Sequence, residues 1–312
     1  MNSANWWARR ASCAKVLLTG AFENSMGPMD RVEPRLAAAV QDLLARPGSM
    51  VRAVTAYLVG LEMGVAEEAA RALACGVEYL HTASLVFDDL PAMDDARLRR
   101  GAPCLHIAHG EAVAMLAALA MINRGYALLW QGMRGARPQR RGEAADWVDA
   151  RLGLLGVIGG QSHDLRGWRG QQSAAEVSEV AARKTGDLLR LTIVLPAIVG
   201  GGTDREIQLL DRLALLRGLA YQAADDLKDV LVSETGSGKT GNRDEELGRP
   251  NLILAEGFQA TLRRFKRLRQ TGDRVQAALP GPAERWGMLA PLRVTLPTIP
   301  QIVLPASAST AG

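Results

Sequence analysis

Two dense clusters of aspartates, far apart in the sequence, constrain the fold of this chain more than any other feature. The first cluster reads Asp88-Asp89-Leu90-Pro91-Ala92-Met93-Asp94-Asp95, and the second reads Asp225-Asp226-Leu227-Lys228-Asp229. Both stand in otherwise apolar sequence, where carboxylates this close together repel one another unless cations lie between them. The fold therefore has to supply positive charge at both clusters.

Magnesium is the cation that suits these clusters. It prefers oxygen ligands, keeps several waters, and is usually bound through a few carboxylates together with substrate phosphates. On a helix, Asp225 and Asp229 lie one turn apart on the same face, a geometry that can bridge to a metal. Pro91 separates Asp88 from Asp94, so the helix must end or bend there if Asp94 is to rejoin the site. The spacing predicts a Mg²⁺ and diphosphate site.

A simpler interpretation is that each cluster is a solvated helix end, since acidic side chains are favourable near a helix N-terminus. For either cluster alone this interpretation competes on equal terms with a metal site. Two such clusters inside apolar helical segments, with Arg99 and Arg100 beside the first, favour the metal site.

The remainder of the chain is typical of an all-α protein. Its 312 residues are 48% hydrophobic and 4% aromatic, enough to bury a large core. Apolar residues recur every three or four positions over residues 36–45, 69–85 and 112–129, whereas the alternation of β-strands is scarce. Proline and glycine punctuation divides the pattern into roughly ten helices.

We divide the chain into an N-terminal extension over residues 1–30, a catalytic domain over residues 31–277 and a C-terminal segment over residues 278–312. The extension lacks a clean period, which predicts irregular or weakly helical structure. Prolines accumulate in the C-terminal segment, and its last residues are small and polar. These features predict a disordered tail.

Charge and cysteine content exclude several functional classes. The formal net charge of +4 comes from scattered Lys and Arg residues without interleaved aromatics, which argues against a nucleic-acid partner. Three widely spaced cysteines without a CxxC pair imply neither disulfides nor zinc and favour the cytoplasm. No apolar run reaches the about 18 residues that a membrane span needs, so we expect no transmembrane segment.

Both clusters and their flanking residues resemble the aspartate-rich motifs of the trans-isoprenyl diphosphate synthases, the polyprenyl synthetase family. The first resemblance runs from His81-Thr82-Ala83-Ser84-Leu85 through the aspartates to Leu98-Arg99-Arg100-Gly101, and the second is Gln222-Ala223-Ala224 followed by the second cluster. Further matches are Gly160-Gln161, Lys184-Thr185-Gly186 and Gly238-Lys239. The resemblance covers about residues 30 to 260 and is greatest to short-chain geranylgeranyl and farnesyl diphosphate synthases.

The resemblance implies a single-domain isoprenoid synthase fold, the class I terpenoid synthase bundle of helices around a central cavity. It implies a Mg²⁺-dependent prenyltransferase that condenses an allylic diphosphate with isopentenyl diphosphate. Metal and cations neutralise the diphosphate as it leaves the allylic carbon, and the double bond of isopentenyl diphosphate attacks the resulting cation. It also implies a homodimer formed through helix packing.

The resemblance further assigns roles to individual residues. The metal ligands are Asp88, Asp89, Asp94, Asp225, Asp226 and Asp229. The residues that contact the allylic diphosphate are Arg99, Lys184, Gln222 and Lys239. Those that bind isopentenyl diphosphate are Arg52, His81 and Arg100. Thr185 offers an oxygen dipole to the cation, and the small residues Ala83 and Ser84, one turn before Asp88, leave room for a product of geranylgeranyl size.

The chain departs from the family pattern at the site for the second diphosphate. The usual Gly-Gly-Lys-x-x-Arg-Pro is replaced by Pro47-Gly48-Ser49-Met50-Val51-Arg52-Ala53, so Ser49 stands where the family has a lysine. A charge-assisted hydrogen bond to such a group is worth roughly 1.5–3 kcal/mol. Two smaller departures are Phe87, where histidine is common, and Arg249, where lysine is common.

Ser49 leaves three functions open. The chain either still condenses with isopentenyl diphosphate, or it is a class I terpene synthase that ionises a prenyl diphosphate without it, or it is a regulatory subunit of a heteromeric synthase. The retained residues Arg52, His81 and Arg100 favour condensation. The six acids argue against a purely regulatory subunit, which has no need of mutually repelling carboxylates.

Overall fold

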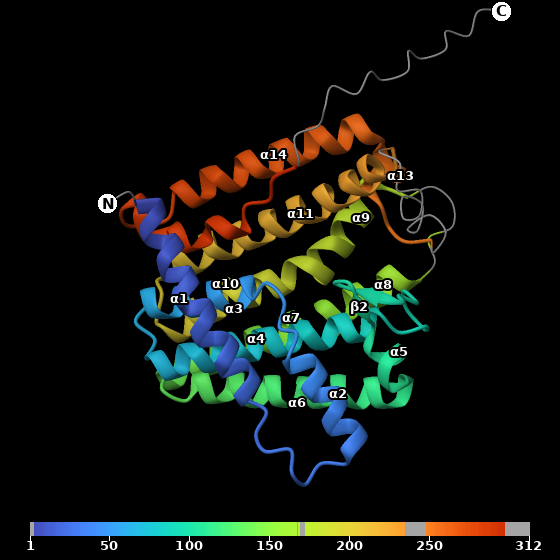
Figure 1. Cartoon of the computed structure of the whole chain (residues 1–312). Helices are drawn as coiled ribbons and strands as arrows, with labels where there is room; N and C mark the ends of the chain where they lie inside the picture. The colour runs from blue at the N-terminus through green and yellow to red at the C-terminus, as the bar shows by residue number, and fades with distance from the viewer. Residues whose placement is uncertain (1–2, 167, 169–171, 235–247, 297–312) are drawn as a thin grey trace, which may run out of the picture.

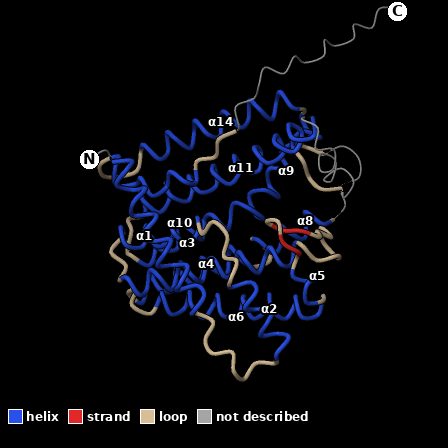
Figure 2. Tube along the Cα trace, in the orientation of Figure 1, coloured by secondary structure: helices blue, strands red, loops and turns tan. Residues whose placement is uncertain are grey.

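The apolar periods of the sequence form helices α2 (Pro34–Leu44), α4 (Glu67–Asp88) and α6 (Glu111–Met133) in a computed structural model of the chain. The structure describes residues 3–166, 168, 172–234 and 248–296. Helices make up most of these residues, as Figures 1 and 2 show. The predicted all-α fold is confirmed.

The other elements complete the bundle. The remaining α-helices are α1 (Ser3–Asn24), α3 (Val51–Glu62), α5 (Leu105–His109), α7 (Pro138–Leu152), α8 (Val157–Leu165), α9 (Ala174–Ala181), α10 (Asp187–Val199), α11 (Asp204–Glu234), α13 (Leu252–Glu256) and α14 (Phe258–Ala277). Three features were not expected: the π-helix η1 (Ala182–Gly186), the 3₁₀-helix η2 (Ala283–Leu292), and a hairpin of β1 (Leu98–Arg99) and β2 (Ala102–Pro103).

The long helices pack side by side in a continuous series. Helix α4 lies between α6 and α3, α10 contacts α3 and α7, and α11 lies between α10 and α14. In Figure 1, α6 and α14 are at opposite sides of the bundle. The two helices that carry the acid clusters, α4 and α11, are therefore both internal to the series.

Glycines allow α4 and α6 to approach closely. A Cβ atom added to Gly76 would lie 2.7 Å from Leu129 Cδ2 and 3.0 Å from the carbonyl oxygen of Gly125. Gly125 in turn faces Leu80, whose Cγ atom would be 3.0 Å from an added Cβ. Dispersion contacts between two backbones this close replace side-chain packing and fix α4 relative to its neighbour.

The N-terminal extension is more regular than we expected from its sequence. Residues 3–24 form one continuous helix, α1, which packs against α3, α4 and η2. Trp7, Leu18 and Phe22 are buried on its inner side, whereas Val16 and Leu17 are exposed. Apolar residues on both faces hide the helical period, so our prediction of irregular or weakly helical structure underestimated the order of this segment.

Helix α6 is the one helix in the described ranges whose length and composition would allow it to cross a membrane. It packs along α4 within the bundle, so its apolar composition does not indicate a membrane span. The predicted tail over residues 297–312 lies outside the described residues. The described part of the C-terminal segment, residues 278–296, contains η2. This helix packs against α1 and α3, and its Trp286 is buried.

Substitution of glycine by alanine should have opposite effects in α4 and α1. Gly76→Ala introduces a Cβ atom against the buried Leu129 and a backbone oxygen, so we expect the free energy of unfolding to fall by about 1–3 kcal/mol. Gly20→Ala is the control: it meets nothing within 4 Å and should stabilise the helix by about 0.5–1 kcal/mol. Denaturant unfolding followed by circular dichroism measures both, and equal shifts of one sign would contradict the packing.

Candidate active site

Most of the residues predicted from the sequence line one cavity of about 820 Å³. The walls come from α3, α4, the residues before and in the hairpin, α6, α8, η1 and α11. The predicted residues that line it are Arg52, His81, Ser84, Asp88, Asp94, Arg99, Lys184, Thr185, Gln222, Asp225 and Asp229. Segments far apart in the sequence thus meet at a single hollow.

The other predicted residues lie elsewhere. Asp89, Asp226, Arg100 and Ala83 are not among the residues that line the cavity. Ala83 is fully buried in the hydrophobic core, which leaves Ser84 as the small residue at the cavity wall. Lys239 lies outside the described residues.

The first cluster turns back on itself immediately after α4. As Pro91 led us to expect, the helix ends at Asp88. The backbone N–H of Asp94 then donates to the carbonyl oxygen of Asp88 at 2.9 Å, and that of Asp95 donates to Leu90 at 3.1 Å. This turn returns Asp94 to the same cavity as Asp88.

Neighbouring aspartates within each cluster have different environments. Asp89 is 4% exposed and accepts from Arg99, whose Nε atom is 2.7 Å from Oδ2 and 2.8 Å from Oδ1. Asp226 is 1% exposed and accepts from Gln222 Nε2 and from the backbone N–H of Leu252, both at 2.8 Å. Asp89 thus orients Arg99, and Asp226 orients Gln222 and joins α11 to α13. Their neighbours Asp88 and Asp225 face the cavity.

Asp88 is the most strongly perturbed acid at the cavity. Burial raises its pKa to about 6, against the attraction of Lys184 and with a further upward contribution from Asp94. Gln161 Nε2 donates to Asp88 Oδ1 at 2.7 Å. Burial makes the ionised form of Asp88 costly, and a nearby metal cation would stabilise that form.

The donor set fits magnesium. Four carboxylates, from Asp88, Asp94, Asp225 and Asp229, line the cavity and supply the oxygen ligands that Mg²⁺ prefers. Among the described residues no group of three His, Cys, Asp or Glu side chains could hold a metal ion by itself. This arrangement suits an ion that completes its coordination with waters and substrate phosphates.

Lys184 faces these acids from the π-helix. Its Nζ atom donates to Asp164 Oδ2 at 2.7 Å. Burial alone would lower the pKa of Lys184, but the charges of Asp88 and Asp164 outweigh it and raise the pKa. Gly160 permits this approach, because a Cβ there would lie 2.6 Å from the backbone nitrogen of Lys184. Single-turn π-helices occur often at functional sites, and this one also places Thr185 at the cavity.

A second cationic region lies beside the first turn of α3. Arg52 Nη1 is 3.1 Å from His81 Nε2. Burial lowers the pKa of His81 well below its ordinary range, and the charges of Arg52 and Arg100 lower it further. His81 is therefore neutral at pH 7. Because the Arg52 guanidinium can only donate, the Nε2 atom of His81 accepts this hydrogen bond. The Arg100 guanidinium lies against Gly48, where an added Cβ would be 2.1 Å from Nη1.

Two polar residues that line the cavity were not among the site residues predicted from the sequence. Tyr221 lines the cavity one turn before Asp225, and the spacing of four residues between Tyr221, Asp225 and Asp229 is the signal that would have identified it. Arg249, noted only as a departure from the family, is 7% exposed and donates to Met93 O and Asp94 Oδ1, both at 2.8 Å. No local pattern predicts this long-range contact.

Apolar side chains form much of the remaining cavity wall. They come mainly from α4, α6, α7, α8 and α10: Leu80, Leu85, Phe87, Ile122, Leu152, Val157, Ile158 and Leu188. The cavity therefore combines charged groups with an apolar wall that can accommodate a hydrocarbon chain.

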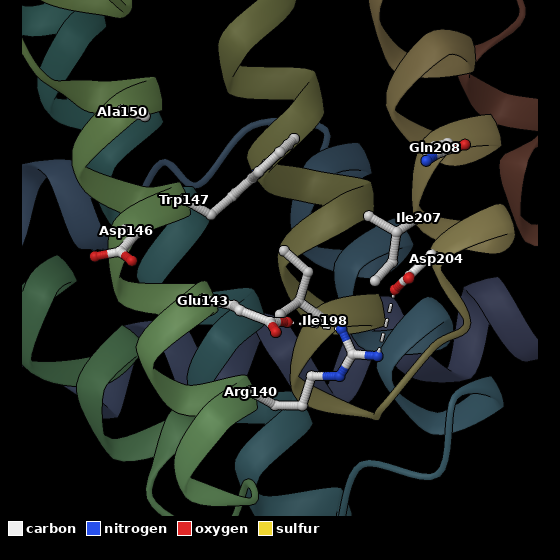
Figure 3. Close-up of a pocket in the computed structure, with 9 residues that line it drawn as sticks. All are labelled: Arg140, Glu143, Asp146, Trp147, Ala150, Ile198, Asp204, Ile207 and Gln208. Atoms are coloured by element: carbon white, nitrogen blue, oxygen red, sulfur yellow. Dashed lines mark hydrogen bonds and ion pairs between the residues drawn. The ribbon is translucent and has the colours of Figure 1, made fainter.

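A smaller hollow of about 450 Å³ lies between α7, α10 and α11 and is drawn in Figure 3. Its one cation, Arg140, donates to Glu143 at 2.6 Å and to the carbonyl oxygen of Gly202 at 3.0 Å. The acids Asp146 and Asp204 also line this hollow. It therefore lacks the surplus positive charge that a diphosphate needs.

Known proteins resemble this chain over most of its length. A family model described as polyprenyl synthetase matches residues 33–278. The geranylgeranyl diphosphate synthase of Pantoea ananas is 31% identical over 254 residues, 80% of this chain and 82% of the relative. A chloroplastic geranylgeranyl pyrophosphate synthase of Capsicum annuum is 34% identical over 78% of this chain and 68% of the relative. A geranyltransferase of Helicobacter pylori, solved with magnesium and isoprenyl diphosphate, shares the fold: its TM-score is 0.78 at 24% identity, with 94% of this chain and 96% of that chain covered.

In metal-free protein, Asp88→Asn should increase stability near neutral pH. The folded protein retains the Asp88 proton up to about pH 6, whereas the ordinary pKa is 3.8, so the folded state loses stability as the pH rises through this window. We expect the variant to be more stable than the wild type at pH 7, by on the order of 1–3 kcal/mol, and equal to it below about pH 4.

Denaturant unfolding in a chelating buffer at several pH values tests this prediction. Asp146→Asn, on the exposed side of α7, serves as the control and should show no such pH-dependent difference. A stability gain for Asp88→Asn that is the same at pH 4 and pH 7 would contradict the assigned cause.

Proposed function

Because this chain belongs to the polyprenyl synthetase family, we propose that it is a Mg²⁺-dependent trans-prenyltransferase that condenses an allylic diphosphate with isopentenyl diphosphate. The proposed product is a short-chain prenyl diphosphate of geranylgeranyl size. The observation that carries this proposal is the meeting of both acid clusters, Arg99 and Lys184 in one cavity that also has an apolar wall. We place the protein in the cytoplasm, without a nucleic-acid partner.

In the proposed reaction the charged residues of the cavity bind the allylic diphosphate. Asp88, Asp94, Asp225 and Asp229 would hold Mg²⁺, which when bound neutralises the leaving diphosphate. Lys184, Arg99 and Gln222 donate to the diphosphate oxygens, and we propose the same role for Lys239. These donors stabilise the negative charge that grows on the diphosphate as its bond to the allylic carbon breaks.

The other cavity residues control what happens to the allylic cation. Thr185 offers its oxygen dipole, and the apolar wall keeps out water that would quench the cation. Arg52, His81 and Arg100 hold isopentenyl diphosphate, whose double bond attacks the cation. The proton that is then lost passes to the released diphosphate. Ser84 at the wall, with Ala83 behind it, leaves space for a long chain.

Asp89 and Asp226 have a modified role in this proposal. Both are buried and hydrogen-bonded to residues that touch the substrate site, Asp89 to Arg99 and Asp226 to Gln222. We propose that they reach the metal site through these partners, by orienting them, and are not direct ligands.

The second candidate function, a class I terpene synthase, follows from Ser49, which is exposed beside the second diphosphate region. Incubation with Mg²⁺ and geranyl, farnesyl or geranylgeranyl diphosphate, with and without isopentenyl diphosphate, separates the possibilities. Elongation that requires isopentenyl diphosphate supports the condensing enzyme. A hydrocarbon or alcohol formed without it supports the terpene synthase, and no product in any mixture supports the regulatory subunit.

Ser49→Lys should improve use of isopentenyl diphosphate if the chain is a condensing enzyme. A restored charge-assisted hydrogen bond should lower KM for isopentenyl diphosphate by about tenfold or more while leaving KM for the allylic substrate unchanged. Steady-state elongation assays measure both constants, and Ser12→Lys on exposed α1 is the control for added charge. Equal constants for wild type and Ser49→Lys would show that position 49 does not contact the diphosphate.

We also propose that the chain forms a homodimer through α6. This helix exposes an apolar stripe in which Leu116, Leu119 and Trp130 are each more than half exposed. Tyr126 and Ile158 are 43% and 57% exposed and also line the cavity, so the cavity is open to water on this side. A second copy packed here would complete the apolar wall that the allylic cation requires.

The position of Asn123 favours a second copy over a lipid surface. This residue is exposed in the same stripe, close to the middle of α6. An amide facing lipid lacks partners and is costly. In a two-fold dimer, a residue near the axis meets its own symmetry mate, and two amides can hydrogen-bond to each other.

Leu119→Glu should therefore give a monomer with reduced prenyltransferase activity. A carboxylate buried in an apolar interface opposes association, and the monomer leaves the cavity wall open. Light scattering after gel filtration measures the mass, and Val16→Glu, at a position on α1 that is 77% exposed, is the control that should remain dimeric. A Leu119→Glu protein of unchanged dimeric mass would contradict the assignment of the interface.

A further inference from the structure

Helix α3 begins without a cap of its own. Its N-cap residue, Met50, has a left-handed backbone with φ of 58° and provides no side-chain acceptor. The first N–H groups of a helix need acceptors from outside the helix. Here Glu78 of α4 supplies one, because the backbone N–H of Ala53 donates to Glu78 Oε2 at 3.1 Å. Glu78 is only 3% exposed, so a buried carboxylate of the neighbouring helix caps α3.

The capped turn carries Arg52 into the cavity. Arg52 Nη1 contacts His81, and His81 lies one turn after Glu78 on the same side of α4. Two side chains of α4 thus hold the turn, one through the backbone of Ala53 and one through the guanidinium. Burial raises the pKa of Glu78, and the charges of Arg52 and Arg100 oppose this rise. The carboxylate therefore lies within the field of both arginines.

The turn before α3 also positions the second arginine. The Arg100 guanidinium rests on Gly48, which has a positive φ of 73°. A shift of the segment from Gly48 to Arg52 would therefore move the Arg52 guanidinium and alter the surface on which Arg100 rests. In a chain that has Ser49 instead of a lysine, both arginines lie close to this turn and can bind the second diphosphate.

We propose that Glu78 is a positioning residue for the second diphosphate: by capping α3 it fixes Arg52 in the orientation that binds isopentenyl diphosphate. This inference rests on the proposed condensing function. Glu78 is not among the residues that line the cavity, so in this proposal it acts through Arg52. Its loss affects the second substrate, while the allylic site around Asp88 and Asp225 keeps its geometry.

The test is a kinetic and calorimetric comparison of Glu78→Ala and Glu78→Gln with the wild type. Glu78→Ala removes the acceptor for Ala53, and KM for isopentenyl diphosphate should rise by about tenfold or more, with kcat and KM for farnesyl diphosphate changed less than about twofold. Glu78→Gln keeps an oxygen acceptor and should give a smaller increase. Titration of metal-free protein with isopentenyl diphosphate alone should show the same order of affinities.

A double-mutant cycle tests the route through Arg52. In an Arg52→Ala background, Glu78→Ala should cause no further loss of isopentenyl diphosphate affinity, because the side chain that it positions is absent. Glu68→Gln, exposed in the first turn of the same helix, is the matched control and should leave both KM values unchanged. Thermal unfolding of each variant identifies any that fail to fold, and Glu78→Gln then decides the question.

The outcomes separate this inference from the proposed function. A wild type that elongates, together with Glu78 variants that behave like Glu68→Gln or lose affinity for both substrates equally, overturns the positioning role and leaves the function intact. A wild type that neither elongates nor binds isopentenyl diphosphate overturns both.

Discussion

The repulsion among carboxylates that share one cavity is the constraint on which this structure depends. Four aspartates from α4, the following turn and α11 line this cavity. Asp225 and Asp229 are exposed, whereas Asp88 is partly buried and its charge is therefore the most expensive of the four. The protein offsets part of this cost with its own donors: Gln161 to Asp88, Arg249 to Asp94, and Lys184 close by. The elements that supply these donors, α8, the π-helix and the segment at Arg249, are thereby held around the acids.

Adjacent aspartates in each cluster also have different roles. Successive residues on a helix point about 100° apart, and in both clusters the two neighbouring acids have different surroundings. Asp88 and Asp225 face the cavity, while Asp89 and Asp226 turn into the protein and bind Arg99, Gln222 and the backbone of Leu252. The second aspartate of each pair therefore orients the donors that lie beside the first.

Much of this arrangement is predictable from the sequence. The parts that were not predicted depend on features that no local pattern reveals. Period and spacing predicted the central helices, the end of α4 near Pro91 and the shared face of Asp225 and Asp229, because these are local properties of a helix. The sequence did not reveal the contact of Arg249 with Asp94, the cap that Glu78 gives to Ala53, or the helix α1. These depend on packing between segments far apart in the chain, or, in α1, on apolar residues that serve both faces.

The second diphosphate region follows the opposite principle to the acid site. At the acid site, negative charge is concentrated for a divalent cation to neutralise. In the second diphosphate region, positive charge is sparse, so the placement of each charge matters more. His81 is neutral, Ser49 brings no charge, and Glu78 offsets part of the field of Arg52 and Arg100. With few charges, affinity for a diphosphate depends on whether each guanidinium is already oriented, since ordering a flexible arginine on binding costs free energy. The buried cap on α3 and the bare backbone at Gly48 both provide this orientation before the substrate arrives. A chain that lacks the family lysine can in this way retain a site for the second substrate, with a positioned Arg52 in place of an additional charge.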